Sequence, residues 1–265
     1  RFLVVDNIKQ SCEMMQQFVY NLGVQRTDTS YTGRDVILKC QENNYDVILL
    51  GYDLGEGKRN GQQVLEQLRV ENLISRSTVI IIITAEISQE MVLAALEHKP
   101  DDYLTKPYSF KGLSQRVIKA FSKKLVMSNI YKAMDDQDPL EVITQCDKLL
   151  SQNTPYKIEC LGIKSRQYYE LEQYQEAQQI YTRYLNATNC QWAAIGMGKI
   201  ALAAEEFELA VSRFQGVIAR YPCYLSAYDW LAKAYKLQHD LLSAESTLEQ
   251  AIKVSPRSVT RLKSY

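Results

Sequence analysis

Residues 45–51 read YDVILLG, an apolar run that opens on a tyrosine and an aspartate and ends in a glycine. Similar strand-like runs occupy residues 2–6, 79–83 and 102–105, and a weaker one lies at 24–29. The strongest of these runs are apolar almost throughout, without alternating polar positions. That pattern is typical of strands in a parallel sheet that is covered on both faces.

Helical periodicity fills the stretches between these strands. Apolar residues three or four positions apart mark three helices, at Met15, Phe18, Val19 and Leu22, at Val64, Leu65 and Leu68, and at Leu93 and Leu96. Gly23 follows the first of them, as expected for the end of a helix. The alternation over residues 1–124 predicts an α/β domain with a doubly wound, flavodoxin-like, five-stranded parallel sheet.

Four residues that could carry chemistry fall where predicted strands end: Asp6, Gly51, Thr84 and Lys106. The carboxyl ends of parallel strands meet at one edge of a sheet, and ligands of doubly wound folds bind there. We therefore expect these four positions to lie together.

This set of residues resembles the receiver domain of two-component response regulators. In that family an acid pair ends the first strand, an aspartate ends the third, Thr or Ser ends the fourth, and Lys-Pro ends the fifth. The resemblance implies that Asp6 is a magnesium ligand, that Thr84 is the hydroxyl switch and that Lys106 is the ammonium that holds a phosphoryl group. Tyr103 matches the aromatic residue that reorients when the family is activated.

The chain departs from the family pattern at the phosphoacceptor position. Gly51 has neither the nucleophilic carboxylate that phosphoryl transfer needs nor a metal ligand. Asn7 replaces the second acid of the pair, so a magnesium ion would meet only a weak site of Asp6, Asn7 and the backbone of Asp53. No cofactor is then required. Asp53 itself could serve as an alternative acceptor or be a plain loop acid, and a native aspartate replaced by Gly51 is a further alternative.

Each of the other residues also has a simpler interpretation when it is taken alone. Asp6 could cap a helix, Thr84 could cap a helix that begins near Ser88, and Lys106 could be a solvated side chain. Their combined placement on consecutive strands favours the receiver interpretation.

The second half, residues 125–265, has no strand-like run and repeats itself with a period near 34 residues. Ala210 and Ala244 are one period apart, as are Pro222 and Pro256. The pattern resembles the tetratricopeptide (TPR) repeat, a pair of packed helices. Repeats are expected at 158–190, 191–224 and 225–258, with a degenerate one at about 126–155 in which Pro139 opens the second helix.

Equivalent positions of the three clear repeats carry Arg166, Lys199 and Lys233. Stacked repeats place such positions in a row along a concave, peptide-binding groove. One hypothesis is that this cationic row binds an acidic peptide segment or a chain terminus. The alternative is a set of unrelated solvated charges.

The composition argues against several classes of function. Lysine plus arginine and aspartate plus glutamate number 31 each, without a long single-sign block, which argues against nucleic acid or a membrane as partner. The six cysteines form no CxxC pair, as in a cytoplasmic bacterial protein. His98 and His239 are far apart, and no nucleophile–base pair is evident, so the chain is not expected to be an enzyme.

The sequence therefore predicts a signalling adaptor of the two-component system. Its degenerate receiver would dock a histidine kinase or another signalling protein, and its repeats would mediate protein–protein interaction. The resemblance also allows a homodimer through the receiver face that bears Tyr103 and the last helix. The alternative is a phosphorylatable response regulator that uses Asp53 or whose native acceptor is replaced by Gly51.

Overall fold

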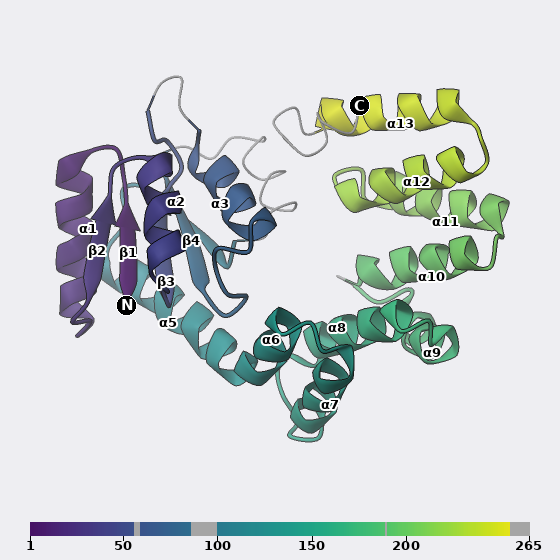
Figure 1. The fold of residues 1–265 in the computed structure, drawn as a ribbon, viewed down its shortest axis with the longest axis horizontal. Coiled ribbons are helices and arrows are strands. Elements are labelled where there is room, and N and C mark those ends of the chain that lie inside the picture. The colour runs from purple at the N-terminus through teal and green to yellow at the C-terminus, as the bar shows by residue number, and fades with distance from the viewer. Residues whose placement is uncertain (56–58, 86–99, 189, 255–265) are drawn as a thin grey trace. The chain divides into compact units, whose positions relative to one another are not determined.

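The computed structural model describes residues 1–55, 59–85, 100–188 and 190–254. The chain divides into two compact units, Arg1–Asp135 and Asp136–Tyr265 (Figure 1). The boundary expected between residues 124 and 125 falls inside the first unit.

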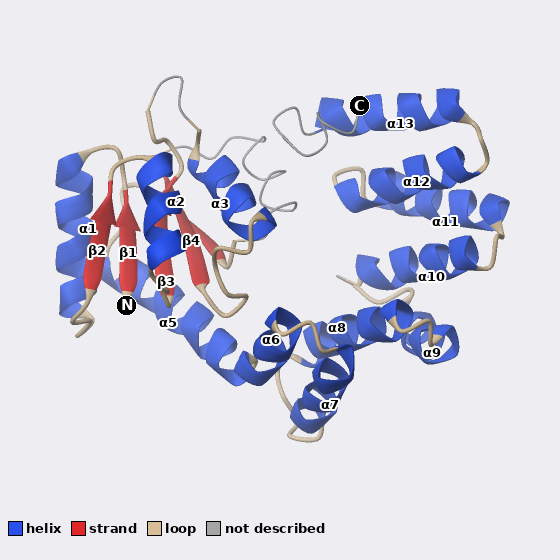
Figure 2. Cartoon of the chain, in the orientation of Figure 1, coloured by secondary structure: helices blue, strands red, loops and turns tan. Residues whose placement is uncertain are grey.

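The first unit is built on a five-stranded parallel sheet (Figure 2). Its strands are β1 (Phe2–Val5), β2 (Thr27–Ser30), β3 (Val47–Gly51), β4 (Val79–Thr84) and β5 (Asp102–Thr105). They lie in the order β2-β1-β3-β4-β5, which is the doubly wound order of flavodoxin-like folds. The predicted fold class is therefore confirmed. The weak strand begins at Thr27, later than its expected start, because Gly23 ends helix α1 with a positive φ of 82° and a short loop follows.

Helices cover both faces of this sheet. They are α1 (Lys9–Asn21), α2 (Gly33–Glu42), α3 (Gly61–Val70) and α5 (Phe110–Val126), and α5 is followed by α6 (Ser128–Asp135). Side chains of the strands alternate between two cores, so that Val4 and Leu49 pack with α1 and α5 while Leu3 and Ile48 pack with α2 and α3. The helix expected at Leu93 and Leu96 lies outside the described residues.

Helix α6 belongs to the first unit because polar contacts fix its end to the turn before β4. Asp135 accepts hydrogen bonds from the Ser75 hydroxyl at 2.7 Å and from the Arg76 backbone N–H at 3.1 Å. The Arg76 guanidinium also lies 3.3 Å from the Asp135 carboxylate. These contacts explain why the division falls after Asp135 and not at the end of α5.

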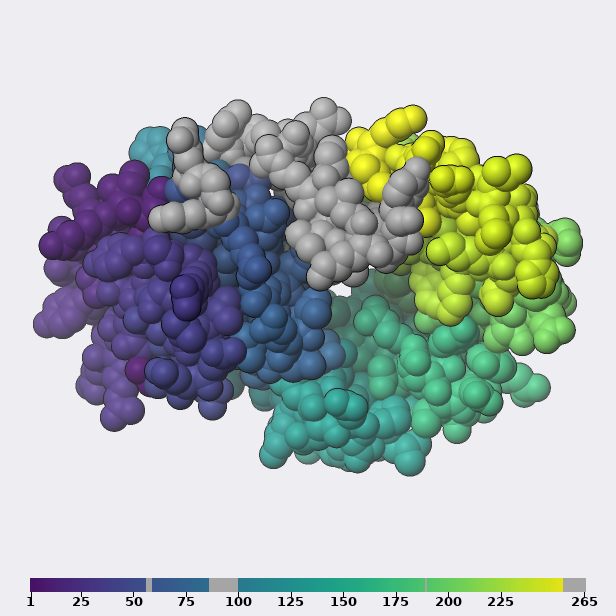
Figure 3. Space-filling model, turned by 45° about the horizontal axis from the view of Figure 1, so that its top comes forward, coloured from purple at the N-terminus to yellow at the C-terminus, as the bar shows by residue number. Residues whose placement is uncertain are grey.

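The second unit is helical. Its described helices are α7 (Pro139–Leu150), α8 (Lys157–Glu170), α9 (Tyr174–Tyr184), α10 (Gln191–Ala203), α11 (Phe207–Arg220), α12 (Leu225–Leu237) and α13 (Leu241–Val254). The pairs α10–α11 and α12–α13 lie inside the expected ranges 191–224 and 225–258, and the pair α8–α9 begins at Lys157, one residue before the expected range 158–190. Helix α7 begins at Pro139, the residue expected to open a helix. Successive helices of this unit pack against one another. In the space-filling view its atoms follow one another from teal through green to yellow (Figure 3). None of the described helices is long and apolar enough to cross a bilayer.

Small residues let the paired helices of the second unit approach closely. A Cβ added at Gly198 of α10 would lie 2.4 Å from the ring of Phe214 on α11, and one at Gly196 would lie 2.3 Å from the ring of Tyr181. Phe214 is fully buried. Each ring therefore fills the space that a side chain on α10 would otherwise occupy.

Gly198→Ala should destabilise the helical unit by roughly 1–3 kcal/mol, because the added methyl group must displace the buried Phe214 ring. Urea unfolding followed by tryptophan fluorescence measures this unit selectively, since both tryptophans, Trp192 and Trp230, lie in it. Gly216→Ala on α11 is the matched control, because nothing lies within 4 Å of its added Cβ. The control should be neutral or stabilising by up to about 1 kcal/mol. Equal effects of the two variants would contradict the packing account.

Candidate functional site

An ion pair joins the ends of β1 and β5 at the carboxyl edge of the sheet. Asp6, which follows β1, is only 2% exposed. One of its carboxylate oxygens accepts the backbone N–H of Ile8 at 3.0 Å, and the other lies 2.6 Å from the Lys106 ammonium. The same ammonium donates to the Ser11 hydroxyl at 3.0 Å. The buried carboxylate thus has a cationic partner within the chain, as a buried charge requires.

Gly51 ends β3 in a space bounded by main chain. A Cβ added there would lie 2.9 Å from the backbone oxygen of Val5, closer than real contacts of that kind. On the α3 side, a Cβ at Gly61 would lie 2.2 Å from the backbone oxygen of Gly51. The end of β1 and the beginning of α3 therefore close in on residue 51, and a side chain at this position would require β1 to move.

Thr84 and Tyr103 lie on the neighbouring strands β4 and β5. Thr84 is 4% exposed, and its backbone oxygen accepts the N–H of Lys106 at 2.7 Å. Tyr103 is partly buried and packs against the core on the α2 and α3 side of the sheet. Burial raises the pKa of its phenol, and within the described part of the chain its buried hydroxyl has no hydrogen-bond partner. The expected switch residues thus sit at the predicted edge, with the aromatic ring turned into the domain.

Burial determines the protonation state of two further side chains at this edge, Cys12 and Tyr108. The Cys12 thiol lies 3.4 Å from the backbone oxygen of Asp6, and burial raises its pKa to about 11. Burial also raises the pKa of Tyr108 to about 12, with a smaller contribution from the negative charge of Asp6. Both groups are therefore protonated at neutral pH, so neither supplies a negative charge to the site.

The residues at this edge do not fit a magnesium ion well. Asn7 is exposed, Gly51 has no side chain, and one oxygen of Asp6 is already bound by the Lys106 ammonium. Asp53 is exposed, and its carboxylate accepts the N–H of Gly55 at 2.8 Å within its own loop. A hard divalent cation needs several free oxygen ligands. In the described ranges no three acidic, histidine or cysteine side chains gather as a metal site.

In the helical unit the structure brings the three predicted cations together. Arg166, Lys199 and Lys233 lie on α8, α10 and α12, the first helices of the three pairs. Burial lowers the pKa of Lys199, and the nearby positive charges of Arg166 and Lys233 lower it further, whereas Glu170 opposes the shift. Glu170 lies 3.8 Å from the Lys199 ammonium. The row therefore carries three positive charges that interact with one another and one nearby carboxylate.

Aromatic rings separate the cations of this row. The Lys199 ammonium lies 3.9 Å from the centre of the Tyr169 ring and 4.7 Å from that of Trp230, and Lys233 lies 4.7 Å from the same Trp230 ring. Ammonium groups are attracted to aromatic faces, so the rings hold the two lysines in place. The Lys199 side chain is only 13% exposed. Tyr169 and Trp230 thus belong to the candidate groove.

Sequence reasoning missed Ser11, Tyr169 and Trp230. Ser11 lies on the first turn of α1, five residues after Asp6, and only the fold brings its hydroxyl to Lys106. For Trp230 a signal did exist, since it stands three residues before Lys233, one turn earlier on the same helix. Its contact with Lys199 of α10 depends on the packing of neighbouring helix pairs.

A comparison with known protein families agrees with the fold of the first unit. The response regulator receiver domain family matches residues 2–118. Together with the sheet order and the placement of Asp6, Thr84 and Lys106, this match identifies the N-terminal part of the chain as a response regulator receiver domain of a two-component system.

Individual relatives match part of the chain. The chain is 28% identical over 174 residues to the response regulator ArlR of Staphylococcus saprophyticus, covering 60% of this chain and 76% of the relative. It is 36% identical over 90 residues to ArlR of Staphylococcus aureus, covering 34% of this chain and only 38% of that relative. The receiver domain of Francisella response regulator 1452 is 30% identical, with a TM-score of 0.41 over 46% of this chain and 96% of that one.

The Asp6–Lys106 ion pair should stabilise the receiver unit. Lys106→Met leaves the buried Asp6 carboxylate without its cation and should lower the opening free energy of β1 amides by roughly 1–3 kcal/mol, a range reduced for the partial exposure of Lys106. Hydrogen exchange measured by mass spectrometry reports this quantity. Asp6→Asn combined with Lys106→Met should recover part of the loss. Lys111→Met, an exposed lysine on α5, is the control, and a loss as large in this variant would refute the assignment.

Proposed function

We propose that this protein is a non-enzymatic adaptor of a two-component system. Its receiver domain docks a histidine kinase or another signalling protein without taking a phosphoryl group at residue 51. Its helical pairs act as TPR-type repeats and hold a second protein through an acidic segment. The observation that carries the first part is the combination of Gly51 with the Asp6–Lys106 ion pair.

Phosphoryl transfer to a receiver places two requirements on the site. A carboxylate nucleophile is needed, and a cation must neutralise the phosphoryl oxygens. Residue 51 has no carboxylate, and the Asp6 carboxylate, which could hold a metal, is 2.6 Å from the Lys106 ammonium. The two charges therefore neutralise each other. A receiver of this kind keeps its docking surfaces but has no use for magnesium as a cofactor.

The alternative acceptor, Asp53, gains little support from its surroundings. Its carboxylate is engaged by the Gly55 N–H in a local turn, and the side chain is exposed. A surface carboxylate without a neighbouring metal site has no means of neutralising an incoming phosphoryl group. The proposal therefore treats Asp53 as a loop acid.

The second part of the proposal rests on the cationic row of Arg166, Lys199 and Lys233. Burial makes it costly to keep Lys199 charged, and the like charges of its two neighbours add to that cost. An acidic peptide along the row would supply the missing negative charge. Trp230 and Tyr169 would offer apolar contact area beside the charges, as recognition sites for peptides often do.

The remaining parts of the proposal follow from this role. The chain is proposed to act in the bacterial cytoplasm, where the kinases of two-component systems present their phosphoryl groups. Nucleic acid and membranes are not among its proposed partners, since positive and negative side chains are equal in number. Homodimerisation through the receiver face that bears Tyr103 and α5 stays a prediction.

Incubation with magnesium and acetyl phosphate should leave the intact mass of the protein unchanged, because the receiver lacks a usable acceptor. The measurement is intact-mass spectrometry of the full chain, repeated with the Asp53→Asn variant. Addition of one phosphoryl group to the wild-type chain and its loss in Asp53→Asn would establish the phosphorylatable alternative and overturn the first part of the proposal.

Charge reversal should abolish binding of an acidic peptide to the helical unit. We expect Lys199→Glu with Lys233→Glu to weaken binding of a fluorescently labelled hexaglutamate peptide at least roughly tenfold, measured by anisotropy at low salt. Lys236→Glu, an exposed lysine on α12, should change it little. Because burial lowers the pKa of Lys199, the wild-type affinity should fall on the alkaline side at a lower pH than for a solvated lysine. Unchanged binding by the double variant would dismiss the row as a binding site.

A further inference from the structure

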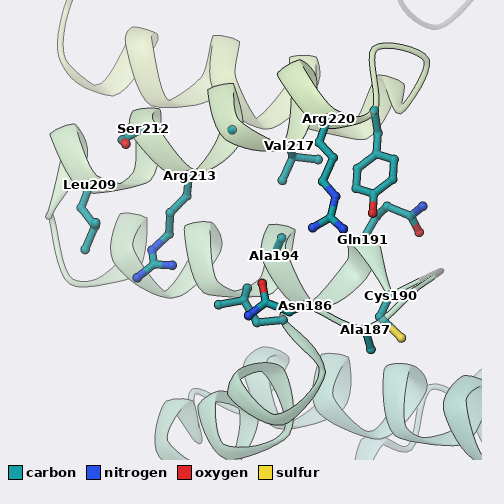
Figure 4. Close-up of a pocket in the computed structure, with 13 residues that line it drawn as sticks. Asn186, Ala187, Cys190, Gln191, Ala194, Leu209, Ser212, Arg213, Val217 and Arg220 are labelled. Atoms are coloured by element: carbon teal, nitrogen blue, oxygen red, sulfur yellow. The ribbon is translucent and has the colours of Figure 1, made fainter.

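A second candidate binding site lies in the helical unit, away from the cationic row. A pocket of about 410 Å³ opens between the turn that joins α9 to α10 and the side of α11 (Figure 4). One wall comes from residues 185–187, 190, 191 and 194, and the other from residues 209, 212, 213, 216, 217, 220 and 221. Arg166, Lys199 and Lys233 do not line it. Its volume lies within the range of sites that bind small molecules.

The lining of this pocket is positively charged. Among the described residues that line it are two arginines, Arg213 and Arg220, and no acidic side chain. The two arginines are seven residues apart on α11, which places them on one face with about 10 Å of helix between them. Figure 4 shows both guanidinium groups extending toward the α9–α10 turn, where Asn186 lies.

Neither arginine is neutralised by the rest of the described chain. In the described ranges no carboxylate lies within salt-bridge distance of Arg213 or Arg220. The chain as a whole has as many acidic as basic side chains, so the positive charge of this pocket is local. The Nε atom of Arg213 is buried and has no hydrogen-bond partner there. A buried donor without an acceptor costs free energy, so a ligand that supplies acceptors to this atom would recover that cost.

The remaining lining residues suit an organic anion better than an inorganic one. Asn186, Gln191 and Ser212 provide neutral hydrogen-bonding groups, and Ala194 and Val217 provide apolar surface between the arginines. Gly216 leaves the wall open, since nothing lies within 4 Å of the position that its Cβ would take. Guanidinium groups bind carboxylate and phosphate oxygens in a bidentate manner.

The geometry points to a binding site for a small organic anion with at least two oxyanion groups, of which two are held by Arg213 and Arg220 while the carbon skeleton lies against Ala194 and Val217. The oxyanion groups are phosphates or carboxylates, which share this chemistry. The site is independent of the proposed phosphate-free receiver and of the cationic row. Its ligand would make the stability of the α10–α11 pair depend on the concentration of a metabolite.

The test is isothermal titration of the full chain with fructose 1,6-bisphosphate, citrate and inorganic phosphate. We expect saturable binding of at least one of the two organic anions and markedly weaker binding of inorganic phosphate. The preferred probe distinguishes a phosphate ligand from a carboxylate ligand. No saturable binding of either organic anion, or binding of inorganic phosphate that is equally tight, would overturn the proposal.

Variants locate the binding within the molecule. Arg213→Gln and Arg220→Gln should each weaken binding of the preferred organic anion roughly tenfold or more, because each removes a bidentate contact. Gly216→Leu should weaken it as well by filling the pocket while both charges remain. Arg183→Gln, an exposed arginine of α9 that does not line the pocket, and Lys233→Gln in the cationic row should bind as the wild type does. Melting followed by circular dichroism checks that each variant is folded. An equal loss of anion binding in the control variants would show that the anion binds through positive charge anywhere on the surface, and would refute the site.

Discussion

The contact between the Asp6 carboxylate and the Lys106 ammonium is the interaction on which the receiver edge depends. It joins two strands that are separated by β3 and β4 in the sheet, and it neutralises a charge that is almost completely buried. A buried carboxylate must find a cation, whether a metal ion or a side chain. In this chain the partner comes from β5, and the second acid that would attract a metal is replaced by Asn7.

The backbone around Gly51 is consistent with that arrangement. The end of β1 and the beginning of α3 approach residue 51 so closely that a side chain has no free space. Gly61 has the same role on the opposite side, since only a glycine allows α3 to begin so near β3. The helical unit uses a related device, with Gly196 and Gly198 receiving the rings of Tyr181 and Phe214. In both units a missing side chain fixes how closely two elements pack.

Much of the fold could be predicted from the sequence because its signals are local. Apolar runs gave the strands, Gly23 and Pro139 marked helix ends, and a period near 34 residues gave the helix pairs. The shared edge of Asp6, Gly51, Thr84 and Lys106 followed from the rule that parallel strands end together. The direct contact of Asp6 with Lys106 could not be predicted, since it depends on side-chain conformations across a span of 100 residues. The boundary after Asp135 could not be predicted either, because it depends on contacts of the Asp135 carboxylate with Ser75 and Arg76. The pocket beside Arg213 was missed for a similar reason, since one of its walls is a turn without a periodic pattern.

A magnesium titration of the isotopically labelled full chain, followed by amide chemical shifts, tests the central claim most directly. The account holds that the Lys106 ammonium serves as the cation of Asp6, so millimolar magnesium should cause no saturable shifts at the edge of the sheet. Potassium chloride of equal ionic strength is the control for screening. Saturable, magnesium-specific shifts of Asp6, Gly51 and Lys106 would show that the metal displaces the ammonium, and would contradict the claim that this receiver works without it.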